Sequence, residues 1–282
     1  ILSVERGLTM RRSRTVMSLL MLAASVMLIS QAGCDAEEGG KTSKPKDEAE
    51  SLNLGEPDVT PPDLEAGDME GNLVDNGTFK DLKGWKRVHS TNVKDKAGLA
   101  TQANCVVWER KNSRNDGGTV GILQDKEIDV SDAEHLHLDL DVWVAYHTLE
   151  NTGLWAEEQG GSGERPAHIR VTYLSEDAKR HVWDHGFLIS SKAEDVLYHN
   201  PQTDKWEYKS GTTTLKNVTP VPEKKWCRFT FDLMDNKTRR GLKGKQTLPK
   251  PAKIERVYIY GNGWDFAAAV GNLCLRAERN IQ

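Results

Sequence analysis

A strict alternation of apolar and polar residues in HLHLDLDVWV, residues 135–144, constrains the fold of this chain more than any other feature. One face would carry Leu136, Leu138, Leu140, Val142 and Val144, and the other His135, His137, Asp139, Asp141 and Trp143. A period of two is the period of a β-strand, whose successive side chains point to opposite faces. The pattern therefore predicts a half-buried strand with its polar face in water.

The same alternation recurs, and no stretch longer than about ten residues shows a convincing helical period. We expect further strands at residues 167–174, 181–190, 226–234, 254–264 and 267–278. Strands separated by loops rich in Gly, Asn, Asp and Pro indicate an all-β, antiparallel β-sandwich of the jelly-roll type. We assign it to residues 72–282, which suffice for one domain.

The N-terminal region is typical of an export signal. Residues 16–29 carry no charge, and this run is shorter than the roughly 20 residues that span a bilayer. Arg11, Arg12 and Arg14 precede it, so we interpret residues 1–33 as a signal peptide with a helical apolar middle, and residues 1–9 as upstream sequence outside the protein.

The end of that signal, Gln31-Ala32-Gly33-Cys34, resembles the bacterial lipoprotein signal. The resemblance implies that Cys34 is acylated and becomes the mature N-terminus, which would tether the protein to a membrane of the cell envelope. The periplasmic face and the cell surface both stay open. A plain signal peptide with an incidental cysteine is the alternative.

Residues 34–71 are rich in Glu, Asp, Lys, Gly and Pro and contain no aromatic residue. Such a segment buries too little apolar surface to offset its ordering entropy, so we expect a disordered, flexible linker. The formal charge of the whole chain is −4. A net acidic protein is poorly suited to binding phosphates, which argues against a nucleic-acid partner. The basic run at residues 237–240, with Lys243, Lys245 and Lys250, is a local exception that we interpret as solvated charge on a loop.

Both ends of the domain resemble jelly-roll modules of the galactose-binding-like superfamily. The resembling stretches are NLVDNGTFKDLKGW (72–85), GILQDKEIDVSDAEHLHLDLDVWV (121–144) and AVGNLCLRAE (269–278). The resemblance implies that the last strand lies beside the first. The best known relatives are carbohydrate-binding modules, and residues 153–187 are also similar to uncharacterised bacterial surface proteins.

Some of these modules hold a structural calcium ion near the first and last strands. Asp75, Asn76 and Thr78 offer oxygen atoms of the kind that calcium prefers. The alternative is an ordinary turn stabilised by an Asn or Asp side chain. No other cofactor is expected.

Tryptophans are the main chemical clue to a ligand, because sugar rings stack on aromatic faces while neighbouring polar groups bind the hydroxyls. Trp85, Trp108, Trp226 and Trp264 fall in or beside expected strands and are assigned to packing. Trp143 falls on a polar strand face, and Trp155 and Trp206 in long loops, which are often functional. The predicted ligand site comprises Trp143, Trp155 and Trp206 as platforms, with Glu157, Glu164, Arg170, Asp184 and His185 as polar partners.

The sequence therefore predicts a lipid-anchored envelope protein that binds an extracellular polysaccharide or oligosaccharide without catalysis. One alternative is a scaffold that docks on an envelope protein through the same loops. Another is a glycan hydrolase or lyase that uses Glu157, Glu158 or Glu164. His181 and His185 would lie about 13 Å apart on a strand, too far to share a metal ion. Export permits disulfides, and the pairing among Cys105, Cys227 and Cys274 is left open.

Overall fold

A computed structural model describes residues 54–89, 96–111, 118–148, 165–189, 197–200, 205–208, 217–239 and 247–279. Contacts divide the chain into residues 1–48 and 49–282, and every described residue belongs to the second unit. The predicted signal segment, Cys34, Trp155, Glu157 and Glu164 lie outside the described residues. Within the described part of the chain, no helix is long and apolar enough to cross a membrane.

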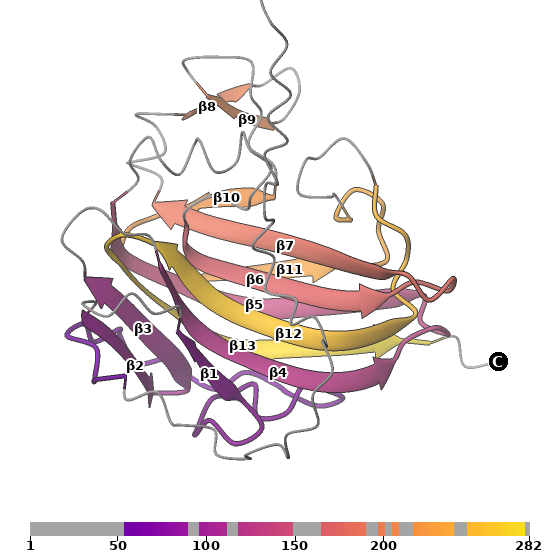
Figure 1. Ribbon diagram of the computed structural model, residues 1–282, viewed down its shortest axis with the longest axis horizontal. Coiled ribbons are helices and arrows are strands. Elements are labelled where there is room, and N and C mark those ends of the chain that lie inside the picture. The colour runs from indigo at the N-terminus through magenta and orange to yellow at the C-terminus, as the bar shows by residue number, and fades with distance from the viewer. Residues whose placement is uncertain are drawn as a thin grey trace, which may run out of the picture. The chain divides into compact units, whose positions relative to one another are not determined.

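A six-stranded sheet forms one layer, in the order β1-β4-β12-β6-β7-β10. Its strands are β1 (Lys86–His89), β4 (Gly118–Asp129), β12 (Lys253–Gly263), β6 (Arg165–Leu174), β7 (Arg180–Ile189) and β10 (Val218–Val221). Every pairing is antiparallel except that of β10 with β7, which is parallel. Figure 1 shows this sheet in front of the second layer.

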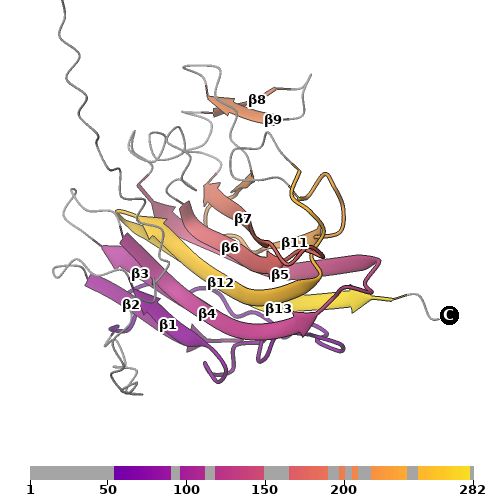
Figure 2. The ribbon, with the colours of Figure 1, turned by 45° about the vertical axis from the view of Figure 1, so that its right-hand side comes forward.

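The second layer is a five-stranded sheet in the order β11-β5-β13-β3-β2. Its strands are β11 (Cys227–Asp232), β5 (His135–His147), β13 (Phe266–Glu278), β3 (Cys105–Lys111) and β2 (Lys96–Gln102). The hairpin of β8 (Leu197–Asn200) and β9 (Lys205–Tyr208) forms a separate two-stranded sheet. The long strands β4, β12 and β6 curve together in Figure 2. The prediction of an all-β sandwich is confirmed.

The core lies between the two sheets, where the alternating residues of each strand meet. On β5 the five apolar residues predicted to share a face, from Leu136 to Val144, are fully buried. Burying each such side chain stabilises the fold by about 1.5–3 kcal/mol. The sequence pattern therefore gave the orientation of this strand correctly.

Residues 54–68, which we call the strap, cross the outer face of the five-stranded sheet and are drawn in indigo in Figure 1. The strap begins beside the edge strand β2, where Gly55 N donates to Ala97 O and Gly55 O accepts from Leu99 N. Further along, Asn104 Nδ2 donates to Leu64 O at 2.9 Å. This packing corrects the predicted boundary of the linker at residue 71, because at least residues 54–71 belong to the folded domain.

Trp143 lies beneath the strap, and the expectation that it faces water is wrong. It is 4% exposed and packs in a second apolar cluster, whose members include Val107, Ala145 and Ala269. Val59 and Leu64 of the strap close this cluster. The alternation placed Trp143 on the outer face correctly, but the strap covers that face.

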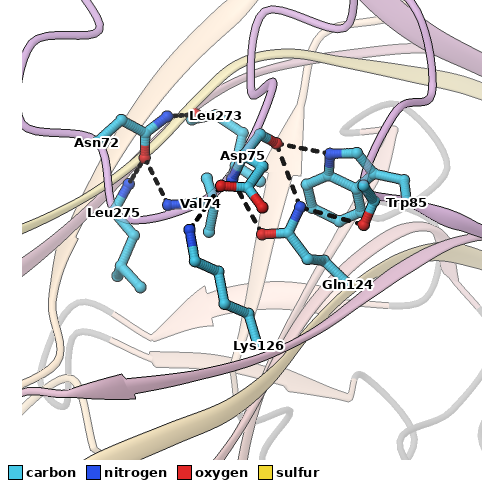
Figure 3. A network of polar contacts seen from close by, with 9 residues as sticks. Asn72, Val74, Asp75, Trp85, Gln124, Lys126, Leu273 and Leu275 are labelled. Carbon is cyan, nitrogen blue, oxygen red and sulfur yellow. Dashed lines mark hydrogen bonds and ion pairs between the residues drawn. The ribbon is translucent and has the colours of Figure 1, made fainter.

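The turn that resembles the opening of jelly-roll modules lies beside the last strand, β13, whereas the first strand, β1, pairs with β4 instead (Figure 3). Asn72 Nδ2 donates to Leu273 O and Asn72 Oδ1 accepts from Leu275 N, both at 2.9 Å. Trp85 Nε1 donates to Asp75 O at 2.8 Å. These hydrogen bonds hold the first residues of the domain against its last strand.

Candidate functional site

Arg170 and Asp184 are brought together by neighbouring strands, whereas His185 is not. Arg170 on β6 is the register partner of Asp184 on β7, and both side chains lie on the outer face of the six-stranded sheet. His185, one residue further, points toward the facing sheet against Phe187 and Phe231 and is partly exposed. The prediction that Asp184 and His185 act on one surface is therefore wrong, because adjacent strand residues point to opposite faces.

A row of side chains crosses this outer face, one from each of five adjacent strands. The strand registers align Lys86, Leu123, Tyr258, Arg170 and Asp184. Neighbouring strands lie about 4.8 Å apart, so the row is about 19 Å long. It has the dimensions of an extended surface for a chain-like ligand.

Asp184 is the centre of a polar group that we call the Asp184 cluster: His168, Arg170, Asp184 and Tyr260. Arg170 Nε donates to Asp184 Oδ2 at 2.6 Å, and the Tyr260 hydroxyl donates to the same oxygen at 2.9 Å. His168 Nδ1 lies 3.0 Å from Asp184 Oδ1. Both carboxylate oxygens are thus engaged, although Asp184 is only 3% exposed.

The charges of the cluster follow from this geometry. Burial acts to raise the pKa of Asp184, but His168 and Arg170 outweigh it and hold the pKa below its usual value. Burial lowers the pKa of His168, against the opposite influence of the Asp184 carboxylate. At neutral pH we therefore assign an ionised Asp184, a charged Arg170 and a neutral His168 whose Nδ1–H donates to the carboxylate.

Three rings stack along the face beside the cluster. The ring centroids of Tyr258 and Tyr260 are 4.2 Å apart, and those of His168 and Tyr260 are 4.5 Å apart with nearly parallel planes. The Arg170 guanidinium lies 5.3 Å from the Tyr260 centroid, within the range of a cation–π contact. Tyr258 ends the stack and is partly exposed.

Two polar groups of the cluster have unused hydrogen-bonding capacity. Arg170 is 29% exposed, and Nε is the one guanidinium nitrogen with an acceptor among the described residues. His168 is 1% exposed, and its Nε2 atom has no partner in the part of the chain that the structure describes. Buried polar atoms without partners are rare, and each calls for an explanation.

Sequence reasoning missed His168, Tyr258 and Tyr260. The signal was present in VYIY, residues 257–260, where Val257 and Ile259 face the core and the tyrosines therefore face outward. Trp206 lies on β9, of which the structure describes the backbone alone, and its predicted role stays a prediction.

A shallow hollow lies near the turn between β12 and β13, and Arg165, Asn262 and Trp264 contribute to its lining. It encloses about 0 Å³, whereas ligand pockets begin at roughly 300 Å³. The candidate site is therefore the outer face of the six-stranded sheet rather than this hollow.

Asp75 and Asn76, two of the three expected calcium ligands, contact other side chains (Asp75 in Figure 3), and the calcium site stays a prediction. The ammonium of Lys126 lies 2.5 Å from Asp75 Oδ1, where it supplies a positive charge to that carboxylate. Asn76 turns its amide nitrogen toward Asp81, with Nδ2 2.6 Å from Asp81 Oδ1. No three His, Cys, Asp or Glu side chains among the described residues are grouped to hold a metal ion.

The three cysteines that the structure describes, Cys105, Cys227 and Cys274, are free thiols. Burial raises the pKa of the Cys105 thiol to about 12. A thiol with so high a pKa is inert at neutral pH, because the thiolate is the reactive form. None of these cysteines contributes to the candidate site.

Protein-family models give no match to this chain, and no curated protein matches it. Solved structures of carbohydrate-binding modules align at low scores. One is the family 11 carbohydrate-binding module from Clostridium thermocellum in complex with a β-1,3-1,4-mixed-linked tetrasaccharide, with 11% identity, a TM-score of 0.39, and coverage of 74% of this chain and 96% of that chain. Another is TmCBM61 in complex with β-1,4-galactotriose, with 7% identity, a TM-score of 0.34, and coverage of 73% and 99%.

The enzymatically active domain of tailspike protein 4 from bacteriophage CBA120 aligns with 9% identity and a TM-score of 0.38. That alignment covers 74% of this chain and only 22% of the tailspike chain. Because all three TM-scores are low, we take neither a ligand nor an activity from these structures. The site must be judged from its own geometry.

Proposed function

We propose that this protein binds a carbohydrate on the outer face of its six-stranded sheet, around Tyr258, Arg170 and the Asp184 cluster. The observation that carries the proposal is the combination of a partly exposed tyrosine ring with unused guanidinium N–H groups in one cross-strand row. Aromatic faces take the C–H patches of a sugar ring, and polar groups fixed in position take its hydroxyls.

The position of the buried charges supports a functional role. Taking Asp184 almost completely, and Arg170 partly, out of water carries a desolvation cost that a pair of apolar side chains would avoid. The fold does not require this pair, since the core between the sheets lies on the other side of both strands. Strongly perturbed groups that lie beside partly exposed side chains, here Arg170 and Tyr258, are typical of ligand sites.

Affinity electrophoresis through gels that contain plant, algal and bacterial polysaccharides tests the proposal. We expect at least one polysaccharide to retard the protein, and Tyr258→Ala to weaken that binding roughly tenfold through loss of about 1.4 kcal/mol of stacking. His137→Ala, on the outer face of the five-stranded sheet, is the matched control and should bind normally. A wild-type protein that no polysaccharide retards, or a Tyr258→Ala variant with full affinity, would overturn the proposal.

One observation favours glycan cleavage as a second candidate function. Asp184 fixes Nδ1 of a neutral His168, which leaves Nε2 unprotonated and without a partner among the described residues. A positioned neutral imidazole is the commonest general base in enzymes. Incubation with the same polysaccharides, followed by assays for new reducing ends and for unsaturated products, distinguishes cleavage from binding alone. A slow reaction that is lost in His168→Gln would support cleavage.

We propose further that Cys34 is acylated and holds the domain at the cell envelope. The support is the sequence before Cys34, with its basic start, apolar middle and small residues at the expected cleavage point. Expression in a bacterial host, membrane fractionation and mass spectrometry of the mature N-terminus test this. Retention in the membrane fraction should depend on Cys34, and a soluble wild-type protein would contradict the anchor.

A further inference from the structure

We infer that the glycan taken by this face is acidic, and that Arg170 binds the carboxylate of a uronate-type sugar. The inference rests on the proposed carbohydrate function and narrows its ligand class. It depends on three features. The Arg170 guanidinium is held in one orientation, its Nη1 and Nη2 atoms lack acceptors among the described residues, and positive charge exceeds negative charge beside Tyr258.

The Arg170 guanidinium is fixed on two sides. Its Nε donates to Asp184 Oδ2 at 2.6 Å, and its Cζ atom lies over the ring of Tyr260, 5.3 Å from the centroid. Asp184 is itself held by His168 and Tyr260 through separate hydrogen bonds. Little side-chain entropy remains to be lost when a ligand binds, which favours affinity.

The terminal nitrogens of Arg170, Nη1 and Nη2, have no acceptor among the described residues, and the side chain is 29% exposed. Their parallel N–H groups match the two oxygens of a carboxylate, which arginine binds in bidentate fashion. A sugar hydroxyl accepts only one of these bonds well. The two parallel N–H groups of Arg170 therefore find better acceptors in a carboxylate than in a neutral sugar.

Positive charge exceeds negative charge along this part of the face. Asp125 is shared by two cations, with Lys86 Nζ at 3.0 Å and Arg256 Nε at 2.6 Å. Arg170 and Asp184 balance each other, and His168 is neutral. Among the described residues one positive charge is thus left over here, on a chain whose formal charge is −4.

Charges further along the same strands form balanced pairs. Arg180 Nε lies 2.7 Å from Glu255, and Lys253 Nζ lies 3.0 Å from Glu127. They therefore do not cancel the excess beside Tyr258. A local cationic excess on an acidic protein attracts an anionic ligand to this region in preference to the rest of the surface.

The test compares uronate polymers with their carboxyl-reduced counterparts, which keep the backbone and lose the charge. Polygalacturonate and alginate, each with its reduced form, are titrated into the whole protein by isothermal calorimetry. We expect at least one acidic polymer to bind at least tenfold more tightly than its reduced form. The affinity for that acidic polymer should fall as sodium chloride is added, because salt screens exposed charges.

Arg170→Gln should abolish the preference for the acidic form, whereas Arg228→Gln, on the outer face of the five-stranded sheet, should keep it. Arg256→Gln is the second variant, because it removes the excess positive charge and leaves the Asp184 cluster intact. It should reduce the preference for the acidic polymer severalfold, and this result does not depend on whether Arg170→Gln folds. Equal binding of acidic and reduced polymers overturns the inference and leaves the proposed function standing. An unchanged preference in folded Arg170→Gln also overturns it. If the protein binds neither acidic nor neutral glycans, both this inference and the proposed function are overturned.

Discussion

Gly121 sets the distance between β4 and β12 in the middle of the candidate face. A Cβ atom at this position would lie 2.2 Å from Ile259 O and 2.6 Å from the Tyr260 Cα atom. Gly121→Ala should therefore force the strands apart, destabilise the domain by about 1–3 kcal/mol and weaken glycan binding by displacing Tyr260. Gly55→Ala, whose Cβ atom would meet nothing closer than 3.8 Å, is the matched control. Denaturant unfolding of both variants measures the difference, and equal stabilities would refute the packing argument.

His185 makes the stability of the core depend on pH. Burial among Trp183, Phe187 and Phe231 lowers its pKa to about 3. The unfolded chain takes up a proton near pH 6.5 and the folded protein does not, so the free energy of unfolding should fall as the pH drops from about 6.5 to about 3. His185→Gln should lose less stability over this range than wild type. Urea unfolding at several pH values checks this, and parallel pH profiles would contradict it.

At the scale of elements, the strap should stabilise the domain and shield Trp143 from solvent. Leu64 closes the apolar cluster around Trp143 from outside. Leu64→Ala should destabilise the domain by roughly 1–2 kcal/mol, below the range for fully buried leucines because Leu64 is only partly buried. Acrylamide should also quench more of the tryptophan fluorescence. Thr60→Ala, at an exposed strap position, should leave both quantities unchanged. Unaltered quenching in Leu64→Ala would mean that the strap does not protect Trp143.

The sequence predicted those features that a local pattern determines. The alternation along residues 135–144 identified β5 and its core face, because strand orientation depends only on neighbouring residues. It could not show that Trp143 is covered, since the cover comes from a segment far away in the chain. Arg170 and Asp184 were singled out from the sequence, and their predicted role in binding stays a prediction; their pairing depends on the β6–β7 register. Tyr258 and Tyr260 were missed because tyrosines on strands are as typical of packing as of binding.

The whole molecule presents two faces of different character. The strap covers one end of the five-stranded sheet with apolar contacts. The six-stranded sheet presents a partly exposed tyrosine and an arginine fork supported by buried partners. This asymmetry is the structural reason to place the ligand on the six-stranded sheet. The predicted loop residues Trp155, Glu157, Glu164 and Trp206 stay predictions, and alanine variants of the two tryptophans would show whether they contribute to the same binding.

Hydrogen–deuterium exchange of the whole protein, with and without a bound oligosaccharide, tests the location of the site most directly. Backbone amides of β12 and β6, which carry Tyr258, Tyr260, His168 and Arg170, should become protected when ligand binds. Amides of β5 and β11 on the opposite sheet should exchange at unchanged rates. Protection confined to β5, β11 or the strap would place the ligand on the other face and contradict the account.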